Sequence, residues 1–136
     1  MKKQHLFPLF VMVVLLAVGS LHAQTGEVKA AIAFDFTAGR MSLPAGEYSI
    51  TAMSDAGRIL CVSGRVSKGF ITSHPVEKNE APATTKLVFR RYGDRYFLHQ
   101  IWVGGNNRGR ELPMTPLEKE LATNAEPALV AVLASK

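Results

Sequence analysis

The sequence predicts an all-β protein: a small antiparallel β-sandwich or barrel with one short helix at about residues 115–123. Two observations carry this prediction. Short segments that alternate apolar and polar residues recur along the chain, and glycine, proline and aspartate separate them. Only one segment combines helical spacing with a helix-start signal. The sequence contains no internal repeat, so we expect a single β-rich domain over residues 24–136.

Residues 1–23 have the layout of a secretory signal peptide. Lys2 and Lys3 precede the uncharged apolar run 6–18, and Ala23 ends a small-residue cleavage site. This run of 13 residues is shorter than the roughly 20 that span a bilayer. We expect export to the periplasm or the exterior, with no transmembrane anchor after cleavage; the alternative is an uncleaved anchor. Loss of both lysines lowers the formal net charge from +5 to +3, and we expect no nucleic-acid partner.

The first half of the domain is predicted to hold three strands. Ile32, Phe34 and Phe36 alternate with small or polar residues, which is typical of one half-buried strand. Pro44-Ala45-Gly46 predicts a turn into a strand over residues 47–53. A second turn at residues 55–57 leads into the apolar run 58–63, which ends at a glycine.

Three further segments are predicted to be an edge strand, a loop and a final strand. Residues 70–73 suit a strand that Pro75 confines to an edge or an end of a sheet. Residues 104–112 are rich in glycine and asparagine and are predicted to be a flexible loop. The tail over residues 129–133 is short and follows a proline, which favours a strand over a helix.

The segment KLVFRRYGDRYFLHQIWVGG, residues 86–105, predicts a central β-hairpin. Gly93 and Asp94 fit a two-residue type II′ turn. An unbroken register from this turn puts one apolar set on the core face: Leu87, Phe89, Leu98 and Trp102. The opposite face then carries Val88, Phe97, Ile101 and Val103. The charged heads of Arg90, Arg91 and Arg95 are expected at the surface, because an unpaired buried guanidinium is costly.

The helix is predicted from its first residues. Thr115 suits the N-cap, Pro116 the first helical position, and Glu118 completes a Thr-x-x-Glu capping box. Leu117 and Leu121 would form the apolar stripe that faces the core.

The segments FDFTAGRMSLPAGEYSI and KLVFRRYGDRYFLHQIW, the latter followed by GREL, resemble a group of small, uncharacterised exported proteins of soil bacteria, especially acidobacteria. Those proteins share a signal peptide, an FDF…LPAGEY segment and a YGDRYFL hairpin. The resemblance covers about residues 34–121. It implies an exported protein and carries no catalytic residue, ligand or cofactor with it.

The residues that could support catalysis or metal binding are few. The chain after residue 23 has two histidines, His74 and His99, and one cysteine, without the spacing of a zinc site. Cys61, His99 and Asp94 could in principle supply a nucleophile, a base and an orienting group, but Cys61 is better explained as a small buried apolar residue. Asp35 and Glu47 are interpreted as solvated carboxylates. We expect no metal and no cofactor.

The best binding candidates are the basic and aromatic residues of the hairpin and the following loop: Arg90, Arg91, Tyr92, Arg95, Arg108 and Arg110. Guanidinium groups suit carboxylates and phosphates, and aromatic faces suit sugars or other flat ligands. Covering the sheet is the competing role of the same residues. We expect an exported non-enzymatic β-domain that acts as a structural or interaction module. The alternatives are a weak binder of anionic envelope polymers or glycans through this hairpin, and an enzyme with a dispersed site. The partner classes left open are an envelope polymer and another protein.

The leader makes a direct prediction. Cleavage after Ala23 should leave Gln24 as the first residue, because the apolar run is short and ends in small residues. Mass spectrometry of the exported chain checks this, and an intact Met1 in a membrane fraction would contradict it.

Overall fold

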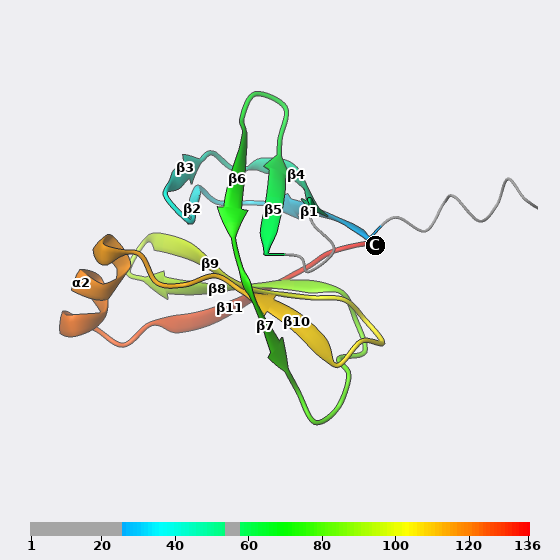
Figure 1. The fold of residues 1–136 in the computed structure, drawn as a ribbon. Coiled ribbons are helices and arrows are strands. Elements are labelled where there is room, and N and C mark those ends of the chain that lie inside the picture. Colours follow the sequence, from blue (N-terminus) through cyan, green and yellow to red (C-terminus); the bar gives the residue numbers. More distant parts are fainter. Residues whose placement is uncertain (1–25, 54–57) are drawn as a thin grey trace, which may run out of the picture.

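The computed structural model describes residues 26–53 and 58–136. They form two facing β-sheets with one helix at an end, as Figure 1 shows. The first sheet has the order β1 (Glu27–Ile32), β4 (Gly46–Ala52), β5 (Ile59–Ser63), β6 (Lys68–Thr72). The second has the order β11 (Ala128–Leu133), β8 (Lys86–Tyr92), β9 (Arg95–Trp102), β10 (Arg108–Glu111), β7 (His74–Glu77).

Two short strands and the helix complete the fold. β2 (Phe36–Ala38) pairs with β3 (Met41–Leu43), and a parallel bridge from Thr37 to Phe97 attaches β2 to β9. The helix α2 (Pro116–Asn124) precedes β11. All other strand pairs are antiparallel, which confirms the predicted all-β fold with one helix. Within the described ranges, no helix is long and apolar enough to cross a membrane. The predicted signal peptide and the predicted turn at residues 55–57 lie outside the described ranges.

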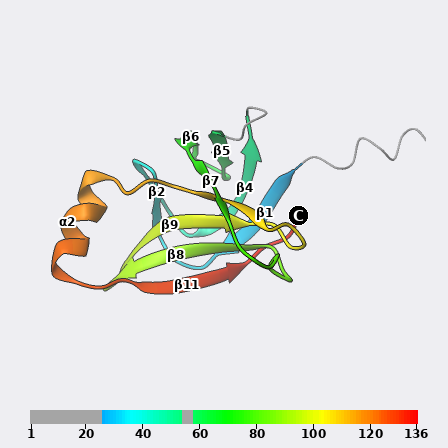
Figure 2. The same ribbon diagram turned by 60° about the horizontal axis from the view of Figure 1, so that its bottom comes forward.

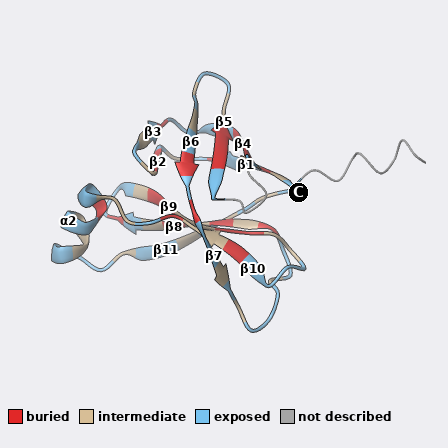
Figure 3. Cartoon of the chain, in the orientation of Figure 1, coloured by how far each residue is buried: buried red, intermediate tan, exposed pale blue. Residues whose placement is uncertain are grey.

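The core lies between the two sheets (Figure 3). Alternate residues of β1, β4 and β5 face inward from the first sheet, and residues of β8 and β9 face them from the second. Leu87 and Phe89 are fully buried there. The strand predicted at residues 70–73 is β6, which lies at an edge of the first sheet and ends before Pro75, as predicted. Pro75 itself lies on β7, an edge strand of the second sheet.

The strand predicted across residues 32–36 is interrupted. β1 ends at Ile32 and β2 begins at Phe36, so this prediction is wrong in its bounds. The reason is an aromatic contact: Phe34 stacks on Tyr96 with ring centroids 3.8 Å apart and meets Phe89 edge-on at 5.0 Å. The break therefore lets Phe34 contact the second sheet.

The loop predicted at residues 104–112 contains strand β10, which corrects that prediction. β10 pairs with β9 on one side and with β7 on the other. Gly109 packs against the Trp102 ring, where an added Cβ would lie 2.6 Å from a ring carbon. Here glycine serves close packing rather than flexibility. The tail forms strand β11, as predicted.

The hairpin of β8 and β9 has the predicted register only near its turn. Arg91 faces Tyr96 and Phe89 faces Leu98, but a bulge at His99 then shifts the register by one residue. One extra residue moves the following side chains to the opposite faces. Ile101 therefore joins the core, and Trp102 is buried on the outer face, contrary to the prediction.

The helix begins as predicted but packs differently. The Thr115 hydroxyl accepts a hydrogen bond from the Glu118 backbone N–H at 3.4 Å. The predicted apolar stripe is not buried, because Leu117 is 46 % exposed and Leu121 is half-buried, whereas Glu118 between them is 3 % exposed. Polar contacts of Glu118, described below, hold the helix to the sheet.

The turn between β8 and β9 allows a controlled test of backbone strain. Gly93 has φ of +65°, and a Cβ there would meet no described atom within 4 Å. Gly93→Val should lower the free energy of unfolding by about 1–3 kcal/mol, because a side chain opposes this conformation. Gly26→Val is the matched control, since Gly26 is equally open and lacks a left-handed φ. Urea unfolding measures both, and equal midpoints would contradict the turn geometry.

Candidate functional site

The six predicted binding residues do not gather at one place. Arg91 and Arg95 are exposed beside the hairpin turn, whereas Arg90 and Tyr92 point to the helix. Arg108 and Arg110 lie on β10, near the other end of β9, where they line a hollow of about 460 Å³ that opens between the two sheets. The hairpin therefore presents two exposed arginines, not a continuous basic and aromatic surface.

Arg90 forms a buried ion pair with Glu118, which corrects the expectation that its head lies at the surface. The Arg90 Nε lies 2.6 Å from Glu118 Oε2, and the side chains are 13 % and 4 % exposed. The Tyr92 hydroxyl donates to the same carboxylate oxygen at 2.9 Å. Burial, and then the hydrogen bond to Glu118, raise the pKa of Tyr92. This contact fastens α2 to the outer face of β8.

A second polar cluster surrounds Glu111 on the outer face of the second sheet. His74 Nε2 lies 2.9 Å from one carboxylate oxygen, and Gln100 donates to the other at 2.8 Å. His99 Nε2 lies 3.6 Å from that second oxygen. The Trp102 indole N–H donates to the Gln100 side-chain oxygen at 3.0 Å. Sequence reasoning missed this cluster, because its members come from three strands.

Protonation in the Glu111 cluster follows from burial and neighbouring charge. Burial alone would raise the pKa of the Glu111 carboxyl, but hydrogen bonds from Gln100 and His74 outweigh it and hold the pKa below its ordinary value. Burial and the Arg90 cation lower the pKa of His99 against the attraction of Glu111. A neutral His99 and an ionised Glu111 therefore coexist near neutral pH. The arrangement ties β7, β9 and β10 together.

The candidate catalytic residues lie apart. Cys61 is buried on β5 of the first sheet, while His99 is on β9 of the second and Asp94 is in the hairpin turn. The Asp35 carboxylate accepts a hydrogen bond from the Ala45 N–H at 2.9 Å, ahead of β4. Among the described residues, no group of three His, Cys, Asp or Glu side chains is placed to hold a metal ion.

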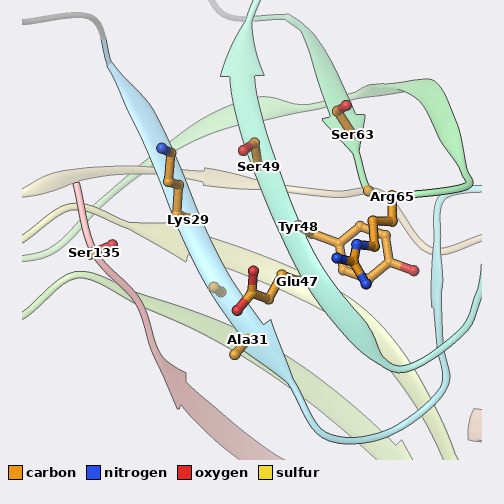
Figure 4. A pocket seen from close by; sticks show the side chains of 10 residues that line it. Lys29, Ala31, Glu47, Tyr48, Ser49, Ser63, Arg65 and Ser135 are labelled. Carbon is orange, nitrogen blue, oxygen red and sulfur yellow. The ribbon is translucent and has the colours of Figure 1, made fainter.

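The outer face of the first sheet carries an open hollow of about 540 Å³ that polar and apolar residues line together (Figure 4). Lys29 and Arg65 lie on either side of Ser49 and Glu47 in this view. Tyr48 lines it too, although the ring is 5 % exposed and belongs to the core. The lining thus combines two cations, one carboxylate and several hydroxyl groups.

Strand register builds this surface. Lys29 on β1 faces Ser49 on β4, and Ser49 faces Ser63 on β5. Ser63 in turn faces Lys68 on β6, and an isolated bridge joins Lys29 to Ser135. We call Ser135, Lys29, Ser49, Ser63 and Lys68 the polar row. Neighbours in it are about 5 Å apart along the hydrogen-bonding direction, a spacing set by sheet geometry. It runs across the whole first sheet.

Comparisons with known proteins gave no match: no family model, no curated protein and no solved structure is significantly similar to the chain.

The buried ion pair makes a stability prediction. Arg90→Gln should lower the free energy of unfolding by about 3–5 kcal/mol, because it leaves the Glu118 carboxylate buried without its cation. Arg91→Gln is the matched control, since Arg91 is the next residue, is exposed and forms none of the ion pairs found among the described residues. It should change stability by less than about 0.5 kcal/mol. Urea unfolding of the two variants measures the difference, and similar losses would contradict the buried pair.

Proposed function

We propose that the protein is an exported, non-enzymatic β-domain that acts by surface contact, and that the polar row and the hollow around it are the contact surface. The layout of the leader and the resemblance to exported proteins of soil bacteria support export. We choose this surface because the strand register aligns Lys29, Ser49, Ser63 and Lys68 across four strands.

The proposal places binding on the first sheet rather than on the hairpin. Of the hairpin's basic residues, Arg90 neutralises Glu118 inside the protein. Arg108 pairs with Glu77 at 3.1 Å near the opposite end of the sheet. Lys29, Arg65 and Lys68 are exposed on one face and take part in none of the ion pairs formed among the described residues. Their charges are therefore available to a ligand.

The chemistry of the hollow fits an acidic polysaccharide. Lys29 and Arg65 offer charged donors to carboxylate groups. Ser49 and Ser63 can donate to or accept from sugar hydroxyls, and the Glu47 carboxylate can accept from them. A purely anionic ligand such as phosphate would be repelled by Glu47, whereas a polymer that alternates carboxylates with hydroxyls matches both kinds of group.

A polymer titration tests this surface. The exported chain should bind polygalacturonate more tightly than neutral dextran of matched length, and binding should weaken as salt rises. The double variant Lys29→Gln, Arg65→Gln should lose about a hundredfold or more in affinity, because each of the two charged hydrogen bonds contributes about 1.5–3 kcal/mol. The double variant Arg91→Gln, Arg95→Gln is the control on the hairpin and should bind like the native chain.

Two outcomes contradict the proposal. Loss of binding in the hairpin variant alone would place the surface on the hairpin. Equal affinity of the native chain for polygalacturonate and dextran would exclude acidic polysaccharide as the partner class.

A further inference from the structure

Strand β11 is an open edge with exposed apolar side chains. It lies at the end of the second sheet, and among the described strands only β8 pairs with it (Figure 2). Leu129 is 68 % exposed and Leu133 is 72 % exposed, and Ala131 between them is exposed as well. The strand ALVAVL has no charged residue to discourage another strand from pairing with it.

The hydrogen bonds beyond the end of β11 show which of its backbone groups face the open edge. The Ala134 N–H donates to Thr85 at 2.9 Å, toward the β8 side. The N–H and C=O of Ser135 both bond to Lys29, on the other side, at 2.8 Å. Successive residues of a strand direct these groups to opposite sides. The backbone groups of Leu129, Ala131 and Leu133 therefore point to the open edge.

The sequence of this edge is a palindrome. Residues 128–134 read Ala-Leu-Val-Ala-Val-Leu-Ala, symmetric about Ala131. Two antiparallel copies with Ala131 on their two-fold axis place Leu129 opposite the partner's Leu133. Val130 then faces the partner's Val132. The Leu129–Leu133 pairs and the central Ala131 pair have backbone groups that face the edge, so each of them exchanges both of its hydrogen bonds, whereas Val130 and the partner's Val132 form the intervening pairs without hydrogen bonds.

Oppositely charged residues flank the palindrome, and the same antiparallel register brings them together across the two copies. Glu126 precedes it and Lys136 follows it, at equal distances from Ala131. The symmetric pairing thus brings Glu126 of each copy toward the partner's Lys136. Ser135 cannot pair with the partner, because its edge-facing N–H and C=O are already bonded to Lys29 of the same chain; Pro127, which the register would place opposite Ser135, also has no N–H to donate. The ladder accordingly spans residues 129–133 and ends there.

We infer that β11 is a self-association edge, at which the β11 strand of a second copy of this chain pairs in antiparallel fashion about Ala131. This pairing makes one continuous sheet from the second sheets of the two copies. Such a contact is isologous, as most dimer contacts are. It is a different surface from the polar row and does not depend on the proposed function. The area of one strand pair is small, so the dimer is a weak one that forms as concentration rises.

A charge exchange at the axis tests the inference. Ala131 is exposed, so Ala131→Lys and Ala131→Glu should each keep the thermal midpoint of the native chain. On a two-fold axis each variant faces its own like charge, and like charges directly opposite destabilise strand pairing. Each variant alone should stay monomeric in sedimentation equilibrium from about 1 μM to about 1 mM, while the native chain shifts toward the dimer mass as expected for a small interface. The two variants mixed in equal amounts should recover the dimer, because Lys then faces Glu.

Three results would contradict the inference. A native chain that stays monomeric over the whole range overturns self-association, including the case in which β11 accepts a different protein. Dimers that persist in both single variants place the contact on another surface. Variants that fail to pair when mixed, although the native chain dimerises, overturn the axis at Ala131.

Discussion

The β-bulge at His99 decides which side chains of the second sheet face the core. Before it, Phe89 and Leu98 point inward together; after it, Leu87 is paired with Ile101, which takes the inward position. The same shift turns Trp102 outward, where Gly109 leaves room for the ring and the Lys78 ammonium lies 4.2 Å from its centre. Gln100 then reaches Glu111. A strand without the bulge would bury Trp102 between the sheets and leave Glu111 without this donor.

The helix α2 is held against the outer face of β8, near the turn of this hairpin. A helix of nine residues has little stability of its own, and tertiary contacts must hold it. Here those contacts are ionic, since Glu118 is buried against Arg90 and Tyr92 while Leu117 stays half exposed. A buried ion pair contributes little net stability compared with apolar packing, but breaking it is costly. The pair therefore fixes where the helix docks more than it adds to the stability of the fold.

Some elements of the fold could be predicted from short stretches of the sequence. The Gly93 turn, the register beside it and the strand character of residues 129–133 follow from patterns within a few residues. The bulge could not be predicted, because both faces of β9 are apolar and no alternation marks the shift. β2 and β10 are three and four residues long and give no measurable period. Glu118 fits the sequence pattern of a helix cap, so nothing in the sequence indicates that its carboxylate is buried against Arg90. The polar row joins residues far apart in sequence, so only the pairing of β1, β4, β5 and β6 reveals it.

The two proposed surfaces meet at one point of the fold. Lys29 of the polar row bonds to Ser135, which follows β11 directly, so the edge of the first sheet and the edge of the second are joined there. A dimer through β11 would consequently carry two polar rows in one rigid unit. A polysaccharide repeats the same acidic group along its length, and a second row held close by would bind the same polymer at a high effective concentration. Weak binding by each row and weak pairing of β11 would then reinforce one another, because the polymer stabilises the dimer as the dimer strengthens binding to the polymer.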